Sequence, residues 1–173
     1  MGPPGQPEAS AAGWSTAFDS ARFRLVLGHY PTGVVVITAV VDDEPVGLAI
    51  GSFASVSLDP PLVLFCVHRL SASWARITGA GVFCVNVLAE DQEQLSRTFA
   101  ARGVDRFEGV GWRPGGTGAP ILDDVIAWME CEIERVEEAG DHVVVVGRVV
   151  DLDVERPGGP LVFFRGGYGR YTH

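Results

Sequence analysis

Residues 33–67, "GVVVITAVVDDEPVGLAIGSFASVSLDPPLVLFCV", decide the fold. The stretch contains three runs rich in β-branched or small residues, at 33–41, 46–57 and 62–67. The turn-forming DDEP separates the first two runs, and Asp59-Pro60-Pro61 separates the last two. β-branched runs bounded by such turns are typical of strands. We therefore expect three strands of an antiparallel meander.

One helix precedes these strands. Apolar residues recur at near-helical intervals from Phe18 to Tyr30, and Pro31 forbids continuation. Thr16 followed by Asp19 resembles a capping box. Residues 1–15 are rich in Pro, Gly, Ala and Ser, so we expect a flexible tail at 1–15 and one folded domain at 16–173.

Downstream, the pattern predicts helices at 71–81 and 90–101, a strand at 82–88 and a loop at 103–124. Residues 127–136 alternate, which predicts a strand with one dry and one wet face. The dry face would carry Met129, Cys131 and Ile133, and the wet face Glu130, Glu132 and Glu134.

The chain ends in two further strand-like segments. The valine-rich run at 143–154 predicts a strand covered on both faces, by a helix or a second subunit, and 160–171 predicts a last strand with a glycine-rich end. Strands that follow one another, without strict alternation with helices, favour a mainly β protein with a few helices. Its fold would be a closed or nearly closed antiparallel barrel.

Composition excludes several classes of function. A net charge of -9 opposes binding to nucleic acid or an anionic membrane. All 13 basic residues are arginine, which removes Schiff-base lysine chemistry and a Walker-type phosphate loop. No apolar run is long enough to span a bilayer and the first residues lack a secretory signal, so the sequence predicts a cytoplasmic protein.

Metal sites and several catalytic motifs are also missing. Cys66, Cys84 and Cys131 lie apart in apolar stretches, which indicates buried small hydrophobes, and the four histidines show no ligand spacing. No GxGxxG follows a strand, and no GxSxG or HExxH occurs. We expect no metal and no Rossmann site.

The small residues between 51 and 57 raise the question of a ligand. Glycine, alanine and serine there combine small size, hydroxyl groups and accessible amides, so a flat ligand with a phosphate could approach the main chain. A strand edge with serines facing water explains the same residues equally well.

Six motifs resemble the flavin reductase domain family, in order along nearly the whole chain outside the tail. They are "YPTGVVVITA", "GLAIGSFASVSLDPPLVLFCV", "SASWARI", "FCVNVL", "AGDHVVVVGRVVDL" and "PLVFFRGGYG". The resemblance implies a dimeric, FMN-binding type of antiparallel split β-barrel with Greek-key-like connections. It also implies binding of FMN or FAD, and supply of reduced flavin to a partner monooxygenase.

The resemblance implies two segments that contact flavin. The first comprises Ala49, Ile50, Gly51, Ser52, Phe53, Ser55 and Val56, and the second Ser71, Ala72, Trp74, Arg76 and Ile77. Serines at a helix N-terminus suit a phosphate. Alternatively, Trp74 is a core residue and Arg76 a solvated helix residue. Many relatives carry Thr or Ser where this chain has Ala49, Gly51 and Ala54, which leaves flavin affinity and the choice between FMN and FAD open.

The resemblance also implies a nicotinamide side of the site. Hydride transfer to flavin needs two stacked rings and no acid–base group of the protein. His142 would orient the nicotinamide as the catalytic residue, or else cap a hairpin. Phe163, Phe164, Arg165, Gly166 and Tyr168 would form the cofactor wall, although Arg165 also suits a solvated strand. Arg102 is a candidate for the adenosine or phosphate part of FAD.

These residues together predict an NADH- or NADPH-dependent flavin oxidoreductase that acts as a homodimer with a partner monooxygenase. One alternative is a flavin-binding or storage protein without turnover. Another is a dimeric structural barrel with a polar seam.

Overall fold

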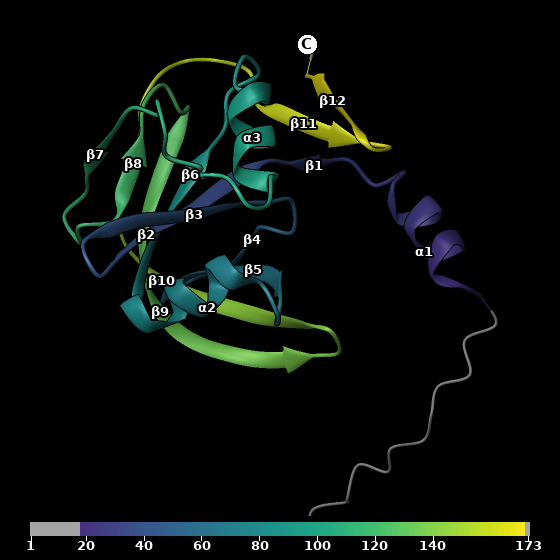
Figure 1. The fold of residues 1–173 in the computed structure, drawn as a ribbon, viewed down its shortest axis with the longest axis horizontal. Helices are drawn as coiled ribbons and strands as arrows, with labels where there is room; N and C mark the ends of the chain where they lie inside the picture. Colours follow the sequence, from purple (N-terminus) through teal and green to yellow (C-terminus); the bar gives the residue numbers. More distant parts are fainter. Residues whose placement is uncertain (1–17, 172–173) are drawn as a thin grey trace, which may run out of the picture.

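The computed structural model describes residues 18–171, and it contains a seven-stranded antiparallel sheet (Figure 1). The expected tail at 1–15 and Thr16 lie outside the described residues. The strand order is β3-β2-β6-β9-β10-β5-β4. The bounds are β2 Val35–Val41, β3 Glu44–Ile50, β4 Ala54–Leu58, β5 Pro61–His68, β6 Val82–Val87, β9 Ala127–Ala139 and β10 His142–Val154.

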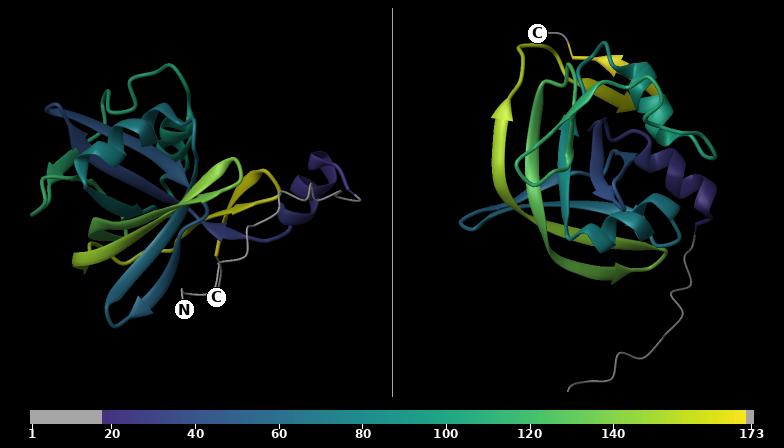
Figure 2. Two further views of the ribbon diagram at one scale, coloured as in Figure 1. Left: turned by 90° about the horizontal axis from the view of Figure 1, so that it is seen from below. Right: turned by 60° about the vertical axis from the view of Figure 1, so that its left-hand side comes forward.

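The two edges of this sheet are consecutive in sequence, because only residues 51–53 separate β3 from β4. Neighbouring Cα atoms are about 3.8 Å apart, so the sheet must curl until these edges approach each other. Figure 2 shows this curl, with the strands wrapped around a central axis in the right-hand view. β3 and β4 do not pair along their length, and the fold is an antiparallel split barrel with its opening at this seam.

The expected three-strand meander is wrong, although the three runs do form strands. The run at 46–57 is broken at residues 51–53 into parts of β3 and β4, which lie at opposite sheet edges. β3 pairs with β2, whereas β4 pairs with β5, which in turn pairs with β10. Local pattern identified the strands but could not assign their non-local partners.

The barrel interior is filled by aromatic and branched side chains. Phe65 lies edge-on to Phe83 at 5.3 Å and to Trp74 at 6.0 Å between ring centroids. Trp74 belongs to α2 (Ala72–Ala80), which packs on β2 and β3 and ends at Gly81 with φ 72°. This confirms the helix predicted at 71–81.

A second cluster lies under α3 (Glu93–Ala100), where Phe99 is fully buried. Gly47 on β3 faces this ring so closely that an added Cβ would meet Phe99 Cε1 at 2.6 Å. The helix predicted at 90–101 is therefore confirmed with shorter bounds, and its position requires glycine at 47.

The helix before the barrel is α1 (Ser20–Leu27), with none of its residues buried. Its N-cap is Asp19, whose carboxylate accepts a hydrogen bond from Arg22 N at 2.7 Å. The capping box starting at Thr16 is thus wrong in register, because the aspartate itself caps the helix. In Figure 1, α1 lies apart from the barrel, on the side opposite β7 and β8.

A three-stranded sheet joins α1 to the barrel: β1 (Thr32–Gly33), β11 (Leu161–Phe164) and β12 (Gly167–Arg170). The expected last strand with a glycine-rich end is in fact a hairpin. Arg165 and Gly166 form its two-residue turn with φ values of 51° and 81°. Positive φ at both turn residues matches the right-handed twist of the strands.

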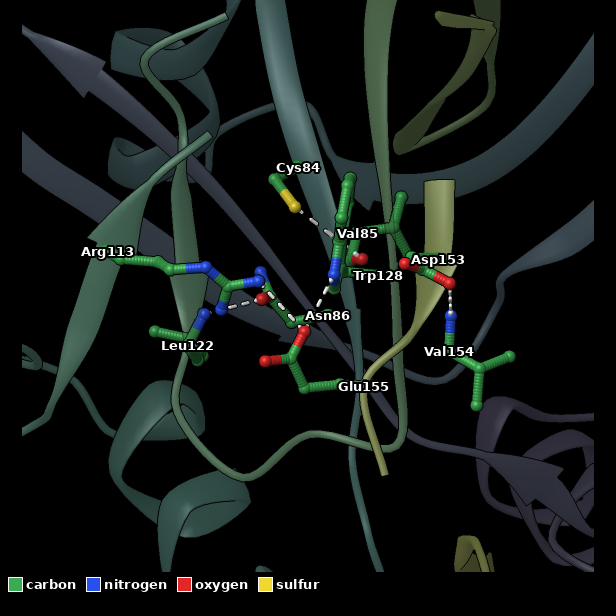
Figure 3. A network of polar contacts seen from close by, with 9 residues as sticks. All are labelled: Cys84, Val85, Asn86, Arg113, Leu122, Trp128, Asp153, Val154 and Glu155. Atoms are coloured by element: carbon green, nitrogen blue, oxygen red, sulfur yellow. Dashed lines mark hydrogen bonds and ion pairs between the residues drawn. The ribbon is translucent and has the colours of Figure 1, made fainter. Parts of the chain in front are cut away.

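The region 103–124, predicted as loop, contains a small hairpin of β7 (Trp112–Pro114) and β8 (Pro120–Leu122). Figure 3 shows how it is tied to the barrel: Arg113 and the Trp128 indole both donate to Glu155 Oε2, at 2.8 and 2.9 Å. Asn86 Oδ1 accepts from Leu122 N at 2.8 Å.

This hairpin overturns the expected wet face of β9 at one position. Glu130 is 1% exposed. Its carboxylate accepts hydrogen bonds from Gly116 N and Thr117 N at 2.8 Å each, and from the Thr117 hydroxyl. The alternation itself was correct, but the strand has a polar loop on its outer face where the sequence predicted water.

β10 is covered on both faces only in its first half. Val143, Val145 and Val146 are buried, whereas Val150 and Leu152 are 45% and 60% exposed. No helix of residues 18–171 covers the second half, so cover by a second subunit stays a prediction there. Within residues 18–171, no helix is long and apolar enough to cross a membrane.

Candidate functional site

The loop that spans the barrel seam is fixed by one serine. Ser52 Oγ donates to Cys66 O and accepts from Cys66 N, at 2.9 Å in each case. The hydroxyl thereby joins residues 51–53 to β5 in place of the backbone hydrogen bonds of a paired strand. Ser52 was predicted to contact flavin, and in this structure both hydrogen bonds of its hydroxyl are made within the protein.

A cleft of about 580 Å³ opens beside this loop. It is lined by residues 51–54, by residues 30–33 and by the ring of Phe163. Gly33 and Gly51 have no side chains that would fill the cleft. An added Cβ at Gly51 would lie 3.1 Å from Thr32 Oγ1. Small side chains beside an aromatic ring leave room for a flat ring system, and the volume is ordinary for a cofactor site.

The remaining residues of the first predicted segment lie outside the seam cleft. Ile50 is buried in the barrel core, and Ala49 packs against the second cluster. Ser55 and Val56 are exposed on β4, where the register shifts. The cleft therefore contains Gly51, Ser52 and Phe53 from the predicted list, together with Ala54.

Several residues of the second predicted segment serve the fold itself. Ser71 caps α2, and its hydroxyl accepts from Trp74 N at 3.3 Å. Trp74 and Ile77 are 5% and 0% exposed and belong to the core. The alternative of a core tryptophan is confirmed, whereas contact of these two residues with flavin stays a prediction.

Ala72 and Arg76, by contrast, line a second cleft together with residues 44–47 and 103–107. Arg76 forms an ion pair with Glu44 at 3.0 Å, with both side chains well exposed. An exposed pair of this kind is weak, so the guanidinium can exchange its partner.

His142 lies at the start of β10, directly opposite His68 on β5. Asp141 Oδ1 is 2.7 Å from His142 Nδ1, and this hydrogen bond holds the pKa of the Asp141 carboxyl below its usual range. Leu70 N donates to His68 Nδ1 at 3.1 Å. Both rings are therefore held through Nδ1.

Main-chain contacts connect this histidine pair with the rest of the site. Ser71 N donates to His68 O, and Arg69 N donates to Asp141 O. Cys66, which holds Ser52, is two residues before His68 on the same strand. The seam loop, the start of α2 and the 139–142 turn thus meet around the end of β5.

The C-terminal hairpin meets only part of its prediction. Phe163 lines the first cleft, and Phe164 lies edge-on to His29 at 6.3 Å. Arg165 N donates to Gly28 O at 2.9 Å, so this turn is attached to α1. Arg165 and Gly166 are exposed at the turn.

Tyr168 points toward α3. Its hydroxyl lies 2.8 Å from Ser96 Oγ, and Arg97 stacks over its ring at 4.9 Å. Tyr168 therefore has a packing role that its pattern did not indicate. Arg102 is exposed and lines neither of the two clefts.

Sequence reasoning missed residues 30–33 and His68. Residues 30–33 were visible as the start of the motif "YPTGVVVITA", but nothing in that motif placed them opposite the seam loop. His68 could have been found only from the pairing of β5 with β10.

Comparison with known proteins places the chain in a family. The profile of the flavin reductase like domain matches residues 27–172. The chain belongs to the flavin reductase like domain family. A Pseudomonas putida protein named flavin reductase is 48% identical over 158 residues, covering 91% of this chain and 93% of that protein.

Two further relatives of this flavin reductase-like chain are informative. The reductase subunit of a flavin-dependent monooxygenase from Rhodococcus jostii is 49% identical, over 88% of this chain and 78% of that protein. A Streptomyces globisporus NADH:FAD oxidoreductase, solved with NAD and FAD fragments, superposes with a TM-score of 0.84 at 39% identity, covering 89% of this chain and 93% of that one.

Proposed function

We propose that this chain is an NADH-dependent flavin reductase that reduces FMN or FAD by direct hydride transfer. The observation that carries the proposal is the small-residue cleft at the barrel seam, which is lined by residues 51–54, by residues 30–33 and by Phe163. A bound flavin would supply the hydride acceptor, N5, while the C4–H bond of the dihydronicotinamide breaks and two electrons move with the hydride.

The protein's own contribution would be orientation. The two rings must be stacked with the reacting atoms about 3–3.5 Å apart, and holding them so supplies most of the acceleration. The loop at 51–53 is suited to this because Ser52 fixes it to β5. His142, fixed by Asp141, would orient the nicotinamide from the adjoining end of β5 and β10.

The choice of NADH, and of a monooxygenase as partner, rests on similarity. The structural relative from Streptomyces globisporus is named an NADH:FAD oxidoreductase, and the relative from Rhodococcus jostii is a monooxygenase reductase subunit. Identities of 39% and 49% over most of each chain support a common reaction. We place this reaction in the cytoplasm, where the unpaired thiols of Cys66, Cys84 and Cys131 would stay reduced.

We further propose a homodimer. The second half of β10 exposes Val150, Leu152 and Val154 at alternate positions of the strand. Contiguous apolar side chains on a sheet surface indicate a protein interface. Replacing Leu152 with glutamate should convert a dimer of wild-type chains into monomers in sedimentation velocity; an unchanged sedimentation coefficient would place the interface elsewhere.

The reductase reaction is tested directly. Purified protein with NADH and excess FMN or FAD should oxidise NADH, which is followed at 340 nm. If NADH is not consumed with either flavin, the proposal is overturned. Flavin binding without NADH loss would identify the storage alternative, and the absence of any thermal shift with either flavin would leave a structural barrel.

A further inference from the structure

The second half of β10 is an open edge of the seven-stranded sheet. β5 pairs with residues 142–148 of β10, and this pairing ends at Leu62, close to the start of β5. On the other side, β9 pairs with β10 as far as Val154. Within residues 18–171, residues 149–154 have no partner strand on the side away from β9. Their backbone groups on that side are therefore accessible to a strand of another chain.

This edge has the composition of a strand that pairs readily. The segment 149–154, VVDLDV, is rich in valine and contains no glycine or proline. Val150, Leu152 and Val154 are 45%, 60% and 72% exposed. An exposed apolar edge strand is a site at which a second chain can pair and association can continue. A feature that opposes such pairing is expected here, because natural sheets protect their edges.

Two backbone donors face this edge. Glu155 N donates to Ile126 O at 2.9 Å, so the N–H group of residue 155 points to the β9 side. Successive N–H groups along a strand point to opposite edges. Leu152 N and Val154 N therefore point away from β9, toward the open edge. A second strand that paired here would accept hydrogen bonds from these two groups.

Both donors are already occupied by aspartate side chains. Asp151 Oδ1 accepts from Leu152 N at 2.9 Å, and Asp153 Oδ1 accepts from Val154 N at 2.7 Å. Figure 3 shows the second of these bonds. Each carboxylate takes a donor that a partner strand would need, and it adds a negative charge at the edge. Two copies that paired here would also bring like charges together, which is unfavourable across strands.

We propose that Asp151 and Asp153 prevent the open edge of β10 from pairing with a strand of a second chain. Association of copies is then limited to side chains that project from the faces of the sheet, as in the proposed homodimer. Edge pairing in addition to that contact would link dimers into open chains, because each dimer would carry two such edges. This protection does not depend on the proposed reductase reaction, and a chain without that activity would test it equally well.

Replacing both aspartates with alanine tests the proposal. Asp151→Ala with Asp153→Ala frees both N–H donors, so this double variant should form species larger than the wild-type assembly in sedimentation velocity. The association constant of these species should exceed the wild-type value at least about tenfold, the effect of one or two additional hydrogen bonds.

Hydrogen exchange locates the contact. In the double alanine variant, the peptide that contains residues 149–154 should exchange more slowly as the protein concentration rises. In wild type, its exchange should not change over the range in which the sedimentation coefficient is constant.

Two control variants separate the hydrogen bonds from the charge. Asp151→Asn with Asp153→Asn keeps an amide oxygen that can accept from each N–H group, so it should sediment like wild type. Glu137→Ala with Glu138→Ala removes the same charge from exposed positions on β9 and should also sediment like wild type. Larger species in either control, at the level of the double alanine variant, would show that charge governs association and would overturn the proposal.

Unchanged sedimentation and exchange in the double alanine variant would overturn it as well. Association of an unfolded chain is recognised by fast exchange in β2 and β6, most of whose residues are buried in the folded protein. In that case Asp153→Ala alone, which frees only Val154 N, repeats the comparison. A folded Asp153→Ala chain that forms no larger species would then refute the proposal.

Discussion

The imidazole rings of His68 and His142 lie edge to face, with 5.4 Å between their centroids and 73° between their planes. They occupy paired positions on β5 and β10, and each ring is held through Nδ1, by Leu70 N in one case and by Asp141 in the other. The arrangement leaves the Nε2 side of each ring as the side available to a ligand. Two histidines fixed in this way, next to the seam loop, support the orienting role proposed for His142.

Replacing His142 with alanine should therefore lower kcat/KM for NADH by about tenfold or more, since misorientation of a stacked pair is costly. Flavin affinity should change little, because His142 is not among the residues that line the seam cleft. Steady-state NADH oxidation and fluorescence titration with FMN measure the two quantities. Asp141→Asn should give a smaller loss. A variant with weaker flavin binding and normal NADH kinetics would place His142 on the flavin side.

Removing the hydroxyl of Ser52 should open the seam. Ser52→Ala loses two hydrogen bonds to Cys66, which at ordinary values costs about 1–3 kcal/mol of unfolding free energy. Flavin affinity should fall with it, because the loop forms the cleft wall. Urea unfolding and flavin titration measure both effects. Ser55→Ala, at an exposed site on β4, should change stability by less than about 0.5 kcal/mol. Equal stability of the two variants would contradict the role given to Ser52.

The sequence predicted most strands and helices because their signals are local. For α2, both end signals lie within the helix's own stretch of sequence: Ser71 caps its start, and Gly81, with positive φ, ends it. The break at residues 51–53 was missed because small residues continue a strand pattern as readily as they interrupt it. Only the pairing of β4 with β5 and of β5 with β10 distinguishes the two.

The candidate site was predictable where the residues of a motif line the cleft. Gly51, Phe53 and Phe163 were identified from motifs and line one cleft. Trp74 and Ile77 come from an equally good motif, yet they lie in the core, because one face of a nine-residue helix must be buried. Arg106 gave no signal at all, since its position depends on a loop that folds back against β3 and α2.

Glu130 should be critical for the β7–β8 hairpin. Glu130→Ala would leave the Gly116 and Thr117 donors unpaired beneath the hairpin, and each buried donor that loses its partner costs about 1–3 kcal/mol. Gly115→Ala should also destabilise, because an added Cβ collides with the Glu130 carboxylate. Chemical unfolding measures both. Glu132→Ala is the control: it lies in an exposed ion pair with Arg148 and should cost about 1 kcal/mol at most. A comparable loss at both glutamates would refute the special role of Glu130.

Two of the three thiols should be inert in the folded protein. Burial raises the pKa of Cys131 to about 12 from an ordinary value of 9.0, and it raises the pKa of Cys84 further, with Glu130 adding to both shifts. The thiolate is the reactive form, so at pH 8 a disulfide reagent such as DTNB should modify neither thiol until the protein unfolds. In urea all three cysteines should react, and Cys66→Ser should leave two reactive thiols.

The raised pKa values also predict how stability depends on pH. The thiols ionise at lower pH in the unfolded chain than in the folded one, so the free energy of unfolding should fall as the pH rises from about 9 toward 12. Rapid native labelling of Cys84 or Cys131 would show that the barrel opens at this site far more often than its packing implies.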